Sequence, residues 1–396
     1  MTNTLENIDP SSLFQVEDNN GALESYITSF ESYREIWGEL LTDNLDRLRR
    51  GSPSLHWMNT EGSNWGTKVK ASSRGLTMTD INRPAVYGNV PAYATWKNFS
   101  PRGSVREPYA ETMPSIEGYD LLYRDDLWSS NVSTLYEEAK DRQWNATRDI
   151  PWDQLKLAEL PEDLELATCQ MATALTEVEF VAGDFPARWM WRIPPDFFEA
   201  KNFLATQIMD EARHMEVFRK RALAANGGLL HASPALEWAL KSILEAPTHT
   251  MGTFLLNLLG EGLVLSIFRS GEFIARTDTD KEIFRLCMQD EARHVSYGTL
   301  ELKNYLDVQD DPTEALEQLH RFADLGEQII LTALSSPALL EPIAILMGGG
   351  LKHIDHGLDG VEILWAVIMD EYLQRCERAG FDRRSRCTLP LELATA

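Results

Sequence analysis

The chain has 396 residues, a formal net charge of −24 and an isoelectric point near 4.7. This excess of acidic groups argues against binding to nucleic acid or to an anionic membrane surface, because both need a basic face. No basic and apolar signal peptide opens the sequence. Its four cysteines lack a Cys-x-x-Cys spacing, so we expect a reduced, cytoplasmic protein.

Residues 1–130 have the pattern of an N-terminal arm that is largely irregular and contains one helix. The spacing of apolar residues predicts that helix over residues 29–50, with its end at Gly51. From there to about Asn131 the sequence is rich in Gly, Pro, Ser, Trp and Tyr and shows no sustained period. A loop of this length is uncommon inside a compact domain unless it is functional or forms an arm.

Helical patterns dominate residues 131–385, and strand patterns are few, which predicts an all-α domain. Residues 386–396 are predicted to be an irregular tail. The predicted helices of this domain cover about 132–145, 161–191, 196–225, 234–245, 248–276, 279–306, 312–335, 338–347 and 360–379. The helix over 279–306 starts at Thr279 or Asp280.

The pentapeptide Asp-Glu-Ala-Arg-His occurs twice, at residues 210–214 and 290–294. A Glu and a His three residues apart lie on one face of a helix. Glu211 with His214, and Glu291 with His294, therefore each present a carboxylate beside an imidazole. A repeated Glu-x-x-His is half of a dinuclear metal site in a four-helix bundle, and one Glu from each of two partner helices is the other half.

The partner glutamates follow from helix geometry. Two antiparallel helices whose ligands face each other at mid-helix place those ligands about 30 residues apart. Glu179 lies 32 residues before Glu211, and Glu261 lies 30 residues before Glu291. Glu177 lies 34 residues before Glu211 and is an alternative that faces another side of the same helix; we favour Glu179.

Glu261 carries a further signal, since it is the only ionisable residue between Met251 and Phe268. A carboxylate in so apolar a helix would be buried, and an unpaired buried charge is very costly. A metal ion removes that cost. The predicted pairing is therefore Glu179 with the first Glu-x-x-His and Glu261 with the second.

Charge balance supports the same ligand set. Four carboxylates and two divalent cations make a neutral site, and mixed carboxylate and imidazole ligands suit iron or manganese. Asp210 and Asp290 are predicted to accept the free N–H of the histidine on the opposite helix. Arg213 and Arg293 are predicted to neutralise these aspartates.

Several apolar side chains near the ligands are candidates for the wall of a substrate pocket. For each one alone, packing in the bundle core is the better interpretation. They are Leu175, Phe180, Ala182, Gly183, Phe218, Leu265 and Phe268.

The double pentapeptide with its two upstream glutamates resembles the ferritin-like diiron-carboxylate superfamily. The segments VEFVAGDFPARWM and FLATQIMDEARH are similar to the first half of the site in bacterial multicomponent monooxygenase hydroxylase subunits. The resemblance covers about residues 165–305. It implies a ferritin-like four-helix bundle core with additional helices. It also implies six metal ligands, which are Glu179, Glu211, His214, Glu261, Glu291 and His294.

The resemblance further implies two iron ions, or a manganese and iron pair, with O₂ as co-substrate. The expected reaction is hydroxylation, N-oxygenation, desaturation or oxidative cleavage of a small organic substrate, with an electron donor of the reductase or ferredoxin type. A homodimer is compatible with it. The alternatives are a radical-generating or Mn/Fe protein like the ribonucleotide reductase small subunits, and a ferritin-like iron-binding protein.

Three positions depart from the patterns of related subfamilies. Leu265 stands where the hydroxylases carry Thr, and Phe218 stands where reductase small subunits carry a radical Tyr. Cys287 stands where p-aminobenzoate N-oxygenases carry an additional His ligand. The motif therefore indicates the superfamily and no particular subfamily.

Overall fold

The structure is a computed structural model. It describes residues 41–53, 124–155, 160–193, 197–224, 227–231, 233–334 and 336–391, together with a few isolated residues. Contacts within the chain divide it into two compact units, one of residues 1–66 and 96–117 and one of residues 67–95 and 118–396. In the first unit the described element is helix α3 (Leu41–Arg49).

Helix α3 ends before Gly51, whose φ of +66° lies in the left-handed region that glycine adopts readily. This agrees with the predicted end of the first helix. The predicted beginning of that helix and most of the predicted irregular segment lie outside the described residues.

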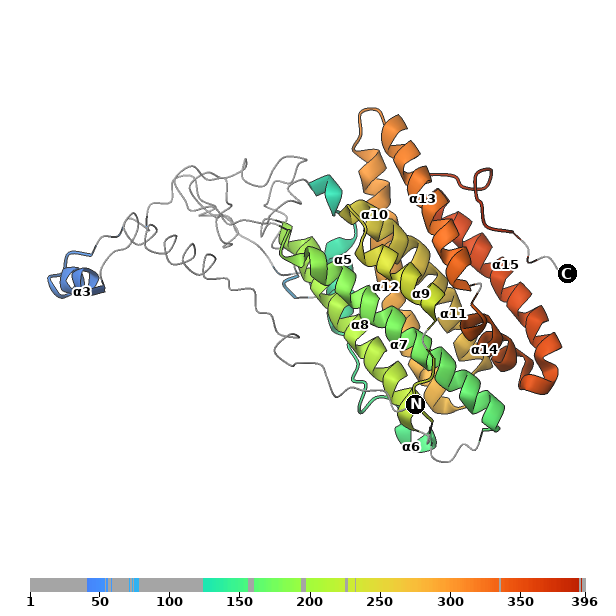
Figure 1. Cartoon of the computed structure of the whole chain (residues 1–396). Coiled ribbons are helices and arrows are strands. Elements are labelled where there is room, and N and C mark those ends of the chain that lie inside the picture. The colour runs from blue at the N-terminus through green and yellow to red at the C-terminus, as the bar shows by residue number, and fades with distance from the viewer. Residues whose placement is uncertain are drawn as a thin grey trace, which may run out of the picture. The chain divides into compact units, whose positions relative to one another are not determined.

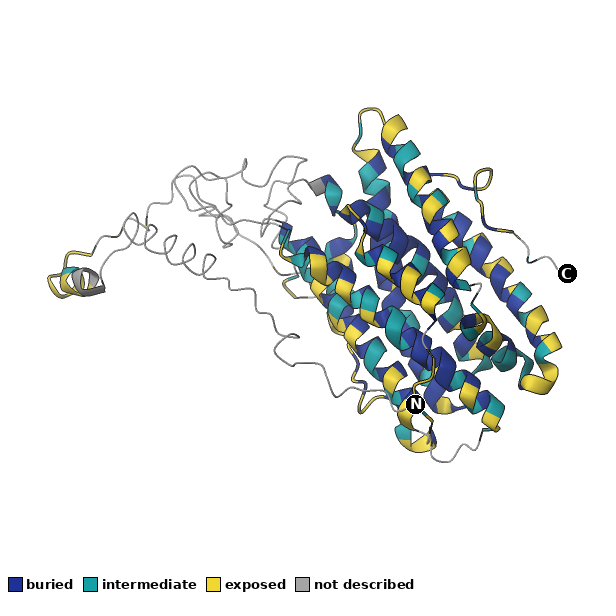
Figure 2. Ribbon diagram, viewed as in Figure 1, coloured by how far each residue is buried: buried dark blue, intermediate teal, exposed yellow. Residues whose placement is uncertain are grey.

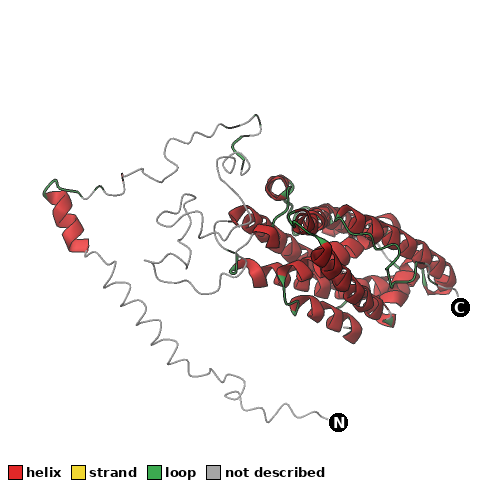
Figure 3. Ribbon diagram, turned by 90° about the horizontal axis from the view of Figure 1, so that it is seen from above, coloured by secondary structure: helices red, strands yellow, loops and turns green. Residues whose placement is uncertain are grey.

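From Arg124 onward, the described chain forms helices and loops only, so the all-α prediction is confirmed (Figure 3). Figure 1 labels the larger helices. In chain order they are η3 (Arg124–Asp126), α5 (Val132–Asp141), α6 (Trp152–Leu155), α7 (Glu162–Met190), α8 (Phe198–Ala224), α9 (Pro234–Leu244), α10 (His249–Thr253), η5 (Phe254–Gly260), α11 (Glu261–Ile274), α12 (Asp278–Asp307), α13 (Thr313–Leu334), α14 (Pro337–Gly348), η6 (Leu351–His353) and α15 (Ile354–Arg378).

Two helical hairpins form the core of the bundle. Helix α7 packs along α8, and the continuous helix α10–η5–α11 packs along α12. Helices α9, α13, α14 and α15 pack around these hairpins. Figure 2 shows that buried residues line the inward faces and exposed residues the outer faces, as amphipathic helices require. The predicted ferritin-like core with additional helices is what the structure shows.

Most helix ends agree with the predictions within a few residues. Helix α12 begins at Asp278, where the side chain of Thr277 accepts the backbone N–H of Asp280 and caps the helix. The beginning of α15 is an exception. Helix α15 begins at Ile354 instead of residue 360. The prediction treated its Gly-Leu-Asp-Gly sequence as a loop, but Gly357 is where α15 crosses α14 at close range, and a Cβ there would lie 1.8 Å from the carbonyl oxygen of Ala344.

The predicted irregular tail is packed onto the bundle as far as it is described. The indole N–H of Trp365 in α15 donates to the carbonyl of Pro390 at 2.7 Å. The backbone N–H and hydroxyl of Thr388 both donate to the buried carboxylate of Glu327 in α13, which also accepts from Arg383. These contacts join residues 383–390 to α13 and α15.

The stretch from α10 to α11 contains a turn of π-helix, η5, that the sequence pattern did not predict. By length and composition His249–Ile274 could cross a membrane, and α13 with α14 passes the same test as a bent pair. Within the structure, 72% of the most apolar window of His249–Ile274 is buried. This is the burial expected of a core helix in a globular protein.

Candidate metal centre

Two overlapping groups of side chains meet inside the core, and within each group the ligand atoms all lie within 4.8 Å of one another. Each of the six side chains is 3% exposed or less. The structure thus brings all six predicted ligands together. The first group is Glu179, Glu211, His214 and Glu291, and the second is Glu211, Glu261, Glu291 and His294.

The predicted pairing of one Glu-x-x-His with each upstream Glu is confirmed, and the structure adds a feature that was not predicted. Glu211 and Glu291 belong to both groups, because each carboxylate has two oxygens and lies between the two positions. We call the remaining pairs the Glu179 position, which has His214, and the Glu261 position, which has His294.

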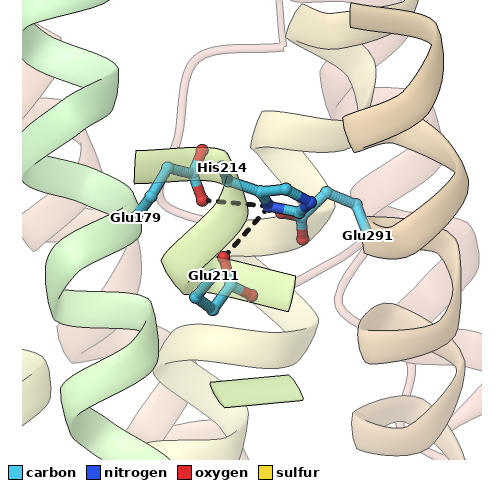
Figure 4. A group of neighbouring side chains, drawn as sticks. All are labelled: Glu179, Glu211, His214 and Glu291. Atoms are coloured by element: carbon cyan, nitrogen blue, oxygen red, sulfur yellow. Dashed lines mark hydrogen bonds and ion pairs between the residues drawn. The ribbon is translucent and has the colours of Figure 1, made fainter. Parts of the chain in front are cut away.

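Figure 4 shows the first of these groups. Glu179 projects from α7, Glu211 and His214 project from one turn of α8, and Glu291 reaches toward them from α12. Nδ1 of His214 lies 3.1 Å from Oε2 of Glu211, 3.1 Å from Oε1 of Glu291 and 3.6 Å from Oε2 of Glu179. Four side chains from three helices therefore converge on one point.

The Glu261 position repeats this arrangement. Nδ1 of His294 lies 2.8 Å from Oε1 of Glu211, 3.5 Å from Oε2 of Glu291 and 3.7 Å from Oε1 of Glu261. In both positions Nδ1 faces the carboxylates, and Nε2 points away from them toward an aspartate.

The unsatisfied atoms of the cluster fit two cations. Buried atoms without a hydrogen-bond partner in the described structure include Oε1 of Glu179, Oε1 of Glu211, both side-chain oxygens of Glu291, and Nδ1 of His294. Unpaired buried polar atoms are rare and costly. Carboxylate oxygens and imidazole nitrogens are ligands of iron and manganese, so these groups are positioned for a dinuclear metal site.

The choice between Glu177 and Glu179 is clear in the structure. Glu179 is 1% exposed and lies in the cluster, whereas Glu177 lines a surface groove with Glu237. Burial raises the pKa of Glu177, and Glu237 acts in the same direction. The preference for Glu179 is therefore correct.

Behind the histidines lies the predicted layer of aspartates and arginines. Nε2 of His214 lies 3.2 Å from Oδ2 of Asp290, and Nε2 of His294 lies 3.3 Å from Oδ2 of Asp210, so each histidine meets the aspartate of the opposite helix. This is the predicted cross-helix contact. An Nε2–H donated to an aspartate leaves the Nδ1 lone pair free for a metal.

Arg213 and Arg293 join the two aspartates into a closed network. The Arg213 guanidinium donates to Asp210 and, at 2.9 Å, to Asp290. Arg293 donates to Asp210 at 2.9 Å and to Asp290 at 2.6 Å. Two carboxylates thus face two guanidinium groups, so the layer is neutral and its buried charges are paired.

The electrostatics of the cluster favour added positive charge. Burial raises the pKa of Glu179 and of Glu261 well above the ordinary value, and the neighbouring carboxylates act in the same direction. Burial also raises the pKa of Glu211, but His294 and His214 outweigh it and hold that pKa well below its usual range. Burial opposes the charged form of both histidines, yet the carboxylates around them raise the pKa of each.

Sequence reasoning missed Trp144, which is 8% exposed and lies beyond the end of α5. Its indole N–H donates to Oδ2 of Asp290 at 2.7 Å, and the guanidinium of Arg213 lies 5.1 Å from the centre of its ring. The helical pattern of residues 132–145 gave no sign of this contact. Helix α5 instead ends at Asp141, which lets the chain turn and place Trp144 against the metal cluster.

A cavity of about 110 Å³ adjoins the cluster. Glu179, Glu261 and Glu291 are its only charged lining residues within the described chain, and nearly all the other lining side chains are apolar. These come from α7, α9, η5, α11, α13 and α14; examples are Leu175, Ala182, Leu240, Leu256, Ile329 and Ile343.

The predicted pocket neighbours have mixed outcomes. Leu175 and Ala182 line this cavity, and Phe218 lines a second cavity that shares Leu175 with it. Phe180 is wrong as a pocket residue, because its side chain is 58% exposed and faces the surface groove. Phe268 packs against Phe218 in the core, which is the simpler interpretation given for it.

No family model and no curated protein matches the chain. Among solved structures it is similar to a point mutant of an R2-like ligand-binding oxidase with an Mn/Fe cofactor, with 17% identity and a TM-score of 0.53, over 63% of this chain and 94% of that chain. A point mutant of such an oxidase with an Fe/Fe cofactor is 17% identical with a TM-score of 0.52, over 63% of this chain and 94% of that chain. An R2-like ligand-binding oxidase with an Mn/Fe cofactor gives 18% and 0.51, over 63% and 93%.

These similarities show the fold, which is the ferritin-like helical bundle. A shared fold does not by itself give a shared reaction, so the function has to be argued from the site.

Proposed function

We propose that the protein is a non-haem dinuclear metal oxidoreductase that uses O₂ to oxidise a small apolar organic molecule. The observation that carries this proposal is the cluster of four carboxylates and two histidines, fully buried and open on one side to an apolar cavity. Burial of so many ionisable groups without cations would be very costly. We expect two iron ions or one manganese and one iron, since the ligands are those of these metals.

In this proposal Glu179, Glu211, His214 and Glu291 would hold one metal ion, and Glu211, Glu261, Glu291 and His294 would hold the other. When bound, the metal pair would supply the electrons with which O₂ is activated. The protein's own contribution is to hold the ligands in place and to exclude water from the reaction.

The tautomer of each histidine leaves Nδ1 available to a metal ion. A proton on Nε2 of His214 is donated to Asp290, and a proton on Nε2 of His294 is donated to Asp210. Nδ1 of each ring is then a lone-pair donor that faces the carboxylates. The arginine pair balances the charge of the two aspartates that accept these protons.

The cavity limits the substrate class. Its wall offers no polar partner besides the metal ligands themselves in the described structure, so a charged or strongly polar substrate would lose its hydration without compensation. A hydrocarbon group reaches the carboxylate cluster at no such cost. The dry wall also keeps water from the oxidant. We propose an electron donor, a reductase or ferredoxin, as the protein partner.

A second candidate function is that of a radical-generating or Mn/Fe protein. The similar solved structures include oxidases with Mn/Fe cofactors, which favours testing manganese as well as iron. Phe218 lies one helical turn after His214 and has no phenol, so it cannot carry a tyrosyl radical.

The test is anaerobic loading with Fe²⁺, with Mn²⁺ or with both, followed by metal analysis and measurement of O₂ uptake. We expect two metal ions per chain and O₂ uptake that an apolar substrate accelerates. Glu211→Ala should lose both metals, whereas the exposed Phe180→Ala should load normally. Failure to bind two metals per chain, or a loaded protein that leaves O₂ unconsumed, would refute the proposal. Uptake of many iron ions per chain would indicate storage, and a persistent organic radical would indicate the second candidate.

A further inference from the structure

The two metal positions differ in how their terminal glutamates are held. Nε2 of Gln207 donates to Oε1 of Glu261 at 2.8 Å, and Nδ2 of Asn257 donates to Oε2 of the same carboxylate at 2.8 Å. Each oxygen of Glu261 therefore accepts a hydrogen bond from a different neutral amide. Glu179, its counterpart at the other position, has Oε2 3.6 Å from Nδ1 of His214, and its Oε1 is without a partner among the described residues, so no described amide holds it.

The π-helical turn η5 presents Asn257 to Glu261. Asn257 lies within η5, is 1% exposed and is four residues before Glu261, the first residue of α11. A π-turn widens the helix and shifts its register, and such turns are often found at functional sites. A side chain of another helix also binds the backbone of this turn, since Nε of Arg375 in α15 donates to the carbonyl of Leu258 at 3.1 Å.

Helix α12 makes room for Asn257 at Gly298, one turn after His294. A Cβ on Gly298 would lie 2.3 Å from Cβ of Asn257, which is too close for any side chain there without movement of η5. The absence of that side chain lets α12 and η5 approach closely. The position of Asn257 is therefore set by the helix that also carries Glu291 and His294.

Gln207 serves the same carboxylate from the opposite side. It is 1% exposed and lies on α8 one turn before Glu211, on the face that points to the cluster. Its own Oε1 has no partner among the described residues, so its amide group is directed by the single bond to Glu261. Three helices thus contribute to fixing one glutamate.

We propose that Gln207 and Asn257 are positioning residues that hold Glu261 in one orientation, so that the Glu261 position binds its metal first and more tightly than the Glu179 position. A ligand that is already ordered loses less conformational freedom when a metal binds. Hydrogen bonds to metal-binding side chains commonly change metal affinity about 10- to 100-fold. No described amide holds Glu179 in this way, so its carboxylate would have to be ordered when a metal binds. This inference rests on the proposed dinuclear metal site.

The experiment is a titration of the metal-free full-length protein with Mn²⁺ or with anaerobic Fe²⁺, in competition with a chromophoric chelator, to obtain stepwise dissociation constants. The wild-type protein should bind two ions with distinct affinities. His294→Ala should abolish the tight class, and His214→Ala should abolish the weak class. These two variants assign the classes without any change to Gln207 or Asn257.

Asn257→Leu and Gln207→Leu should each weaken the tight class about tenfold or more and leave the weak class within about twofold of wild type. Leucine removes the amide and has as many side-chain heavy atoms as asparagine and one fewer than glutamine, and circular dichroism checks that each variant is folded. Gln170→Leu is the matched control, because Gln170 is a buried amide of α7 whose hydrogen bonds within the described chain go to the backbone of His231. It should leave both constants unchanged.

Several results would overturn the inference. Two ions bound with one affinity, an exchanged assignment by the histidine variants, or an equal effect of the leucine variants on both classes would each do so. In all of these the protein still binds two metals, and the proposed function survives. A wild-type protein that binds no metal pair would instead refute the proposed function, and this inference would fail with it.

Discussion

At the scale of single residues, the paired Asp-Arg network behind the histidines is the feature most open to test. Asp290 accepts hydrogen bonds from Trp144, Arg213 and Arg293 and lies 3.2 Å from Nε2 of His214. It is fully buried, and its contact with His214 and its ion pairs with the arginines hold its pKa well below the usual range despite that burial. These contacts favour the ionised form of Asp290, which orients His214.

Replacing that anion tests the orientation directly. Asp290→Asn keeps the shape of the side chain but can present an N–H to Nε2, which favours the wrong tautomer of His214. We expect metal affinity to fall about 10- to 100-fold. Asp307→Asn removes one negative charge from the exposed end of α12, where Asp307 pairs with Lys303. It should leave the metal affinity unchanged. Equal affinities of the two variants in a chelator competition would contradict this role.

A second pair of buried ionisable residues lies away from the cluster. Burial lowers the pKa of His249 to about 4, although its Nδ1 lies 3.0 Å from the carbonyl of Asp126. Glu301 has Oε1 4.0 Å from that Nδ1, and burial together with the charge of Asp126 raises its pKa well above the ordinary value. Burial therefore disfavours the charged form of both groups in the folded protein.

Their effects on stability have opposite signs. As the pH falls from 7 to 5, the unfolded histidine binds a proton that folded His249 does not, so this group costs about 2 kcal/mol of stability by pH 5. Glu301 acts the other way, because the unfolded carboxyl loses its proton as the pH rises above about 4.5, while the raised pKa of the folded carboxyl keeps the proton on it to a higher pH. Between pH 7 and pH 5, the free energy of unfolding of His249→Phe should therefore rise relative to that of the wild-type protein. That of Glu301→Gln should fall relative to the wild-type protein. Urea unfolding at pH 5 and pH 7 measures both, and parallel behaviour of the two variants would contradict the assignment.

At the scale of elements, the crossing of α14 and α15 depends on one glycine. A Cβ on Gly357 would meet the Ala344 backbone at 1.8 Å, whereas a Cβ on Gly360 would meet only the side chain of Met347, at 2.9 Å. We expect Gly357→Ala to destabilise the protein by about 2–3 kcal/mol, since a backbone cannot yield as a side chain can. Gly360→Ala, in the same helix, should be nearly neutral. Urea midpoints that fall equally in both variants would show that helix propensity, and not the crossing, determines the effect.

The same element shows where sequence reasoning stops. Apolar spacing predicts that α15 exists, but it cannot show that Gly357 serves a close helix crossing, because that depends on α14. The π-turn η5 has a similar explanation. Its residues are apolar apart from Asn257, so no period distinguishes a π-turn from an α-turn. Asn257 was visible as a polar residue in this run, but its bond to Glu261 depends on the turn.

At the scale of the whole molecule, the ligand set was predictable because it is local and repeated. Glu-x-x-His lies within one helical turn, and hairpin geometry gives the distance to each upstream Glu. The sharing of Glu211 and Glu291 between positions was not predictable, because it depends on how the two hairpins face each other. The roles of Trp144 and Gln207 were not predicted for the same reason. Each contacts a residue of another helix, Asp290 and Glu261 respectively, and sequence spacing does not relate the two partners.

The cluster also predicts how metals affect the stability of the entire bundle. Its six ligands come from all four core helices, so a metal pair bound only in the folded state opposes separation of either hairpin. Binding at a free concentration about 1,000 times the dissociation constant adds about 4 kcal/mol. For a domain of this size we expect the melting temperature to rise by about 10 °C when Fe²⁺ or Mn²⁺ is added, and to return on chelation. Glu211→Ala should melt at one temperature with or without metal, because both positions lose a shared ligand, and a metal-dependent shift in this variant would place the stabilising ion elsewhere.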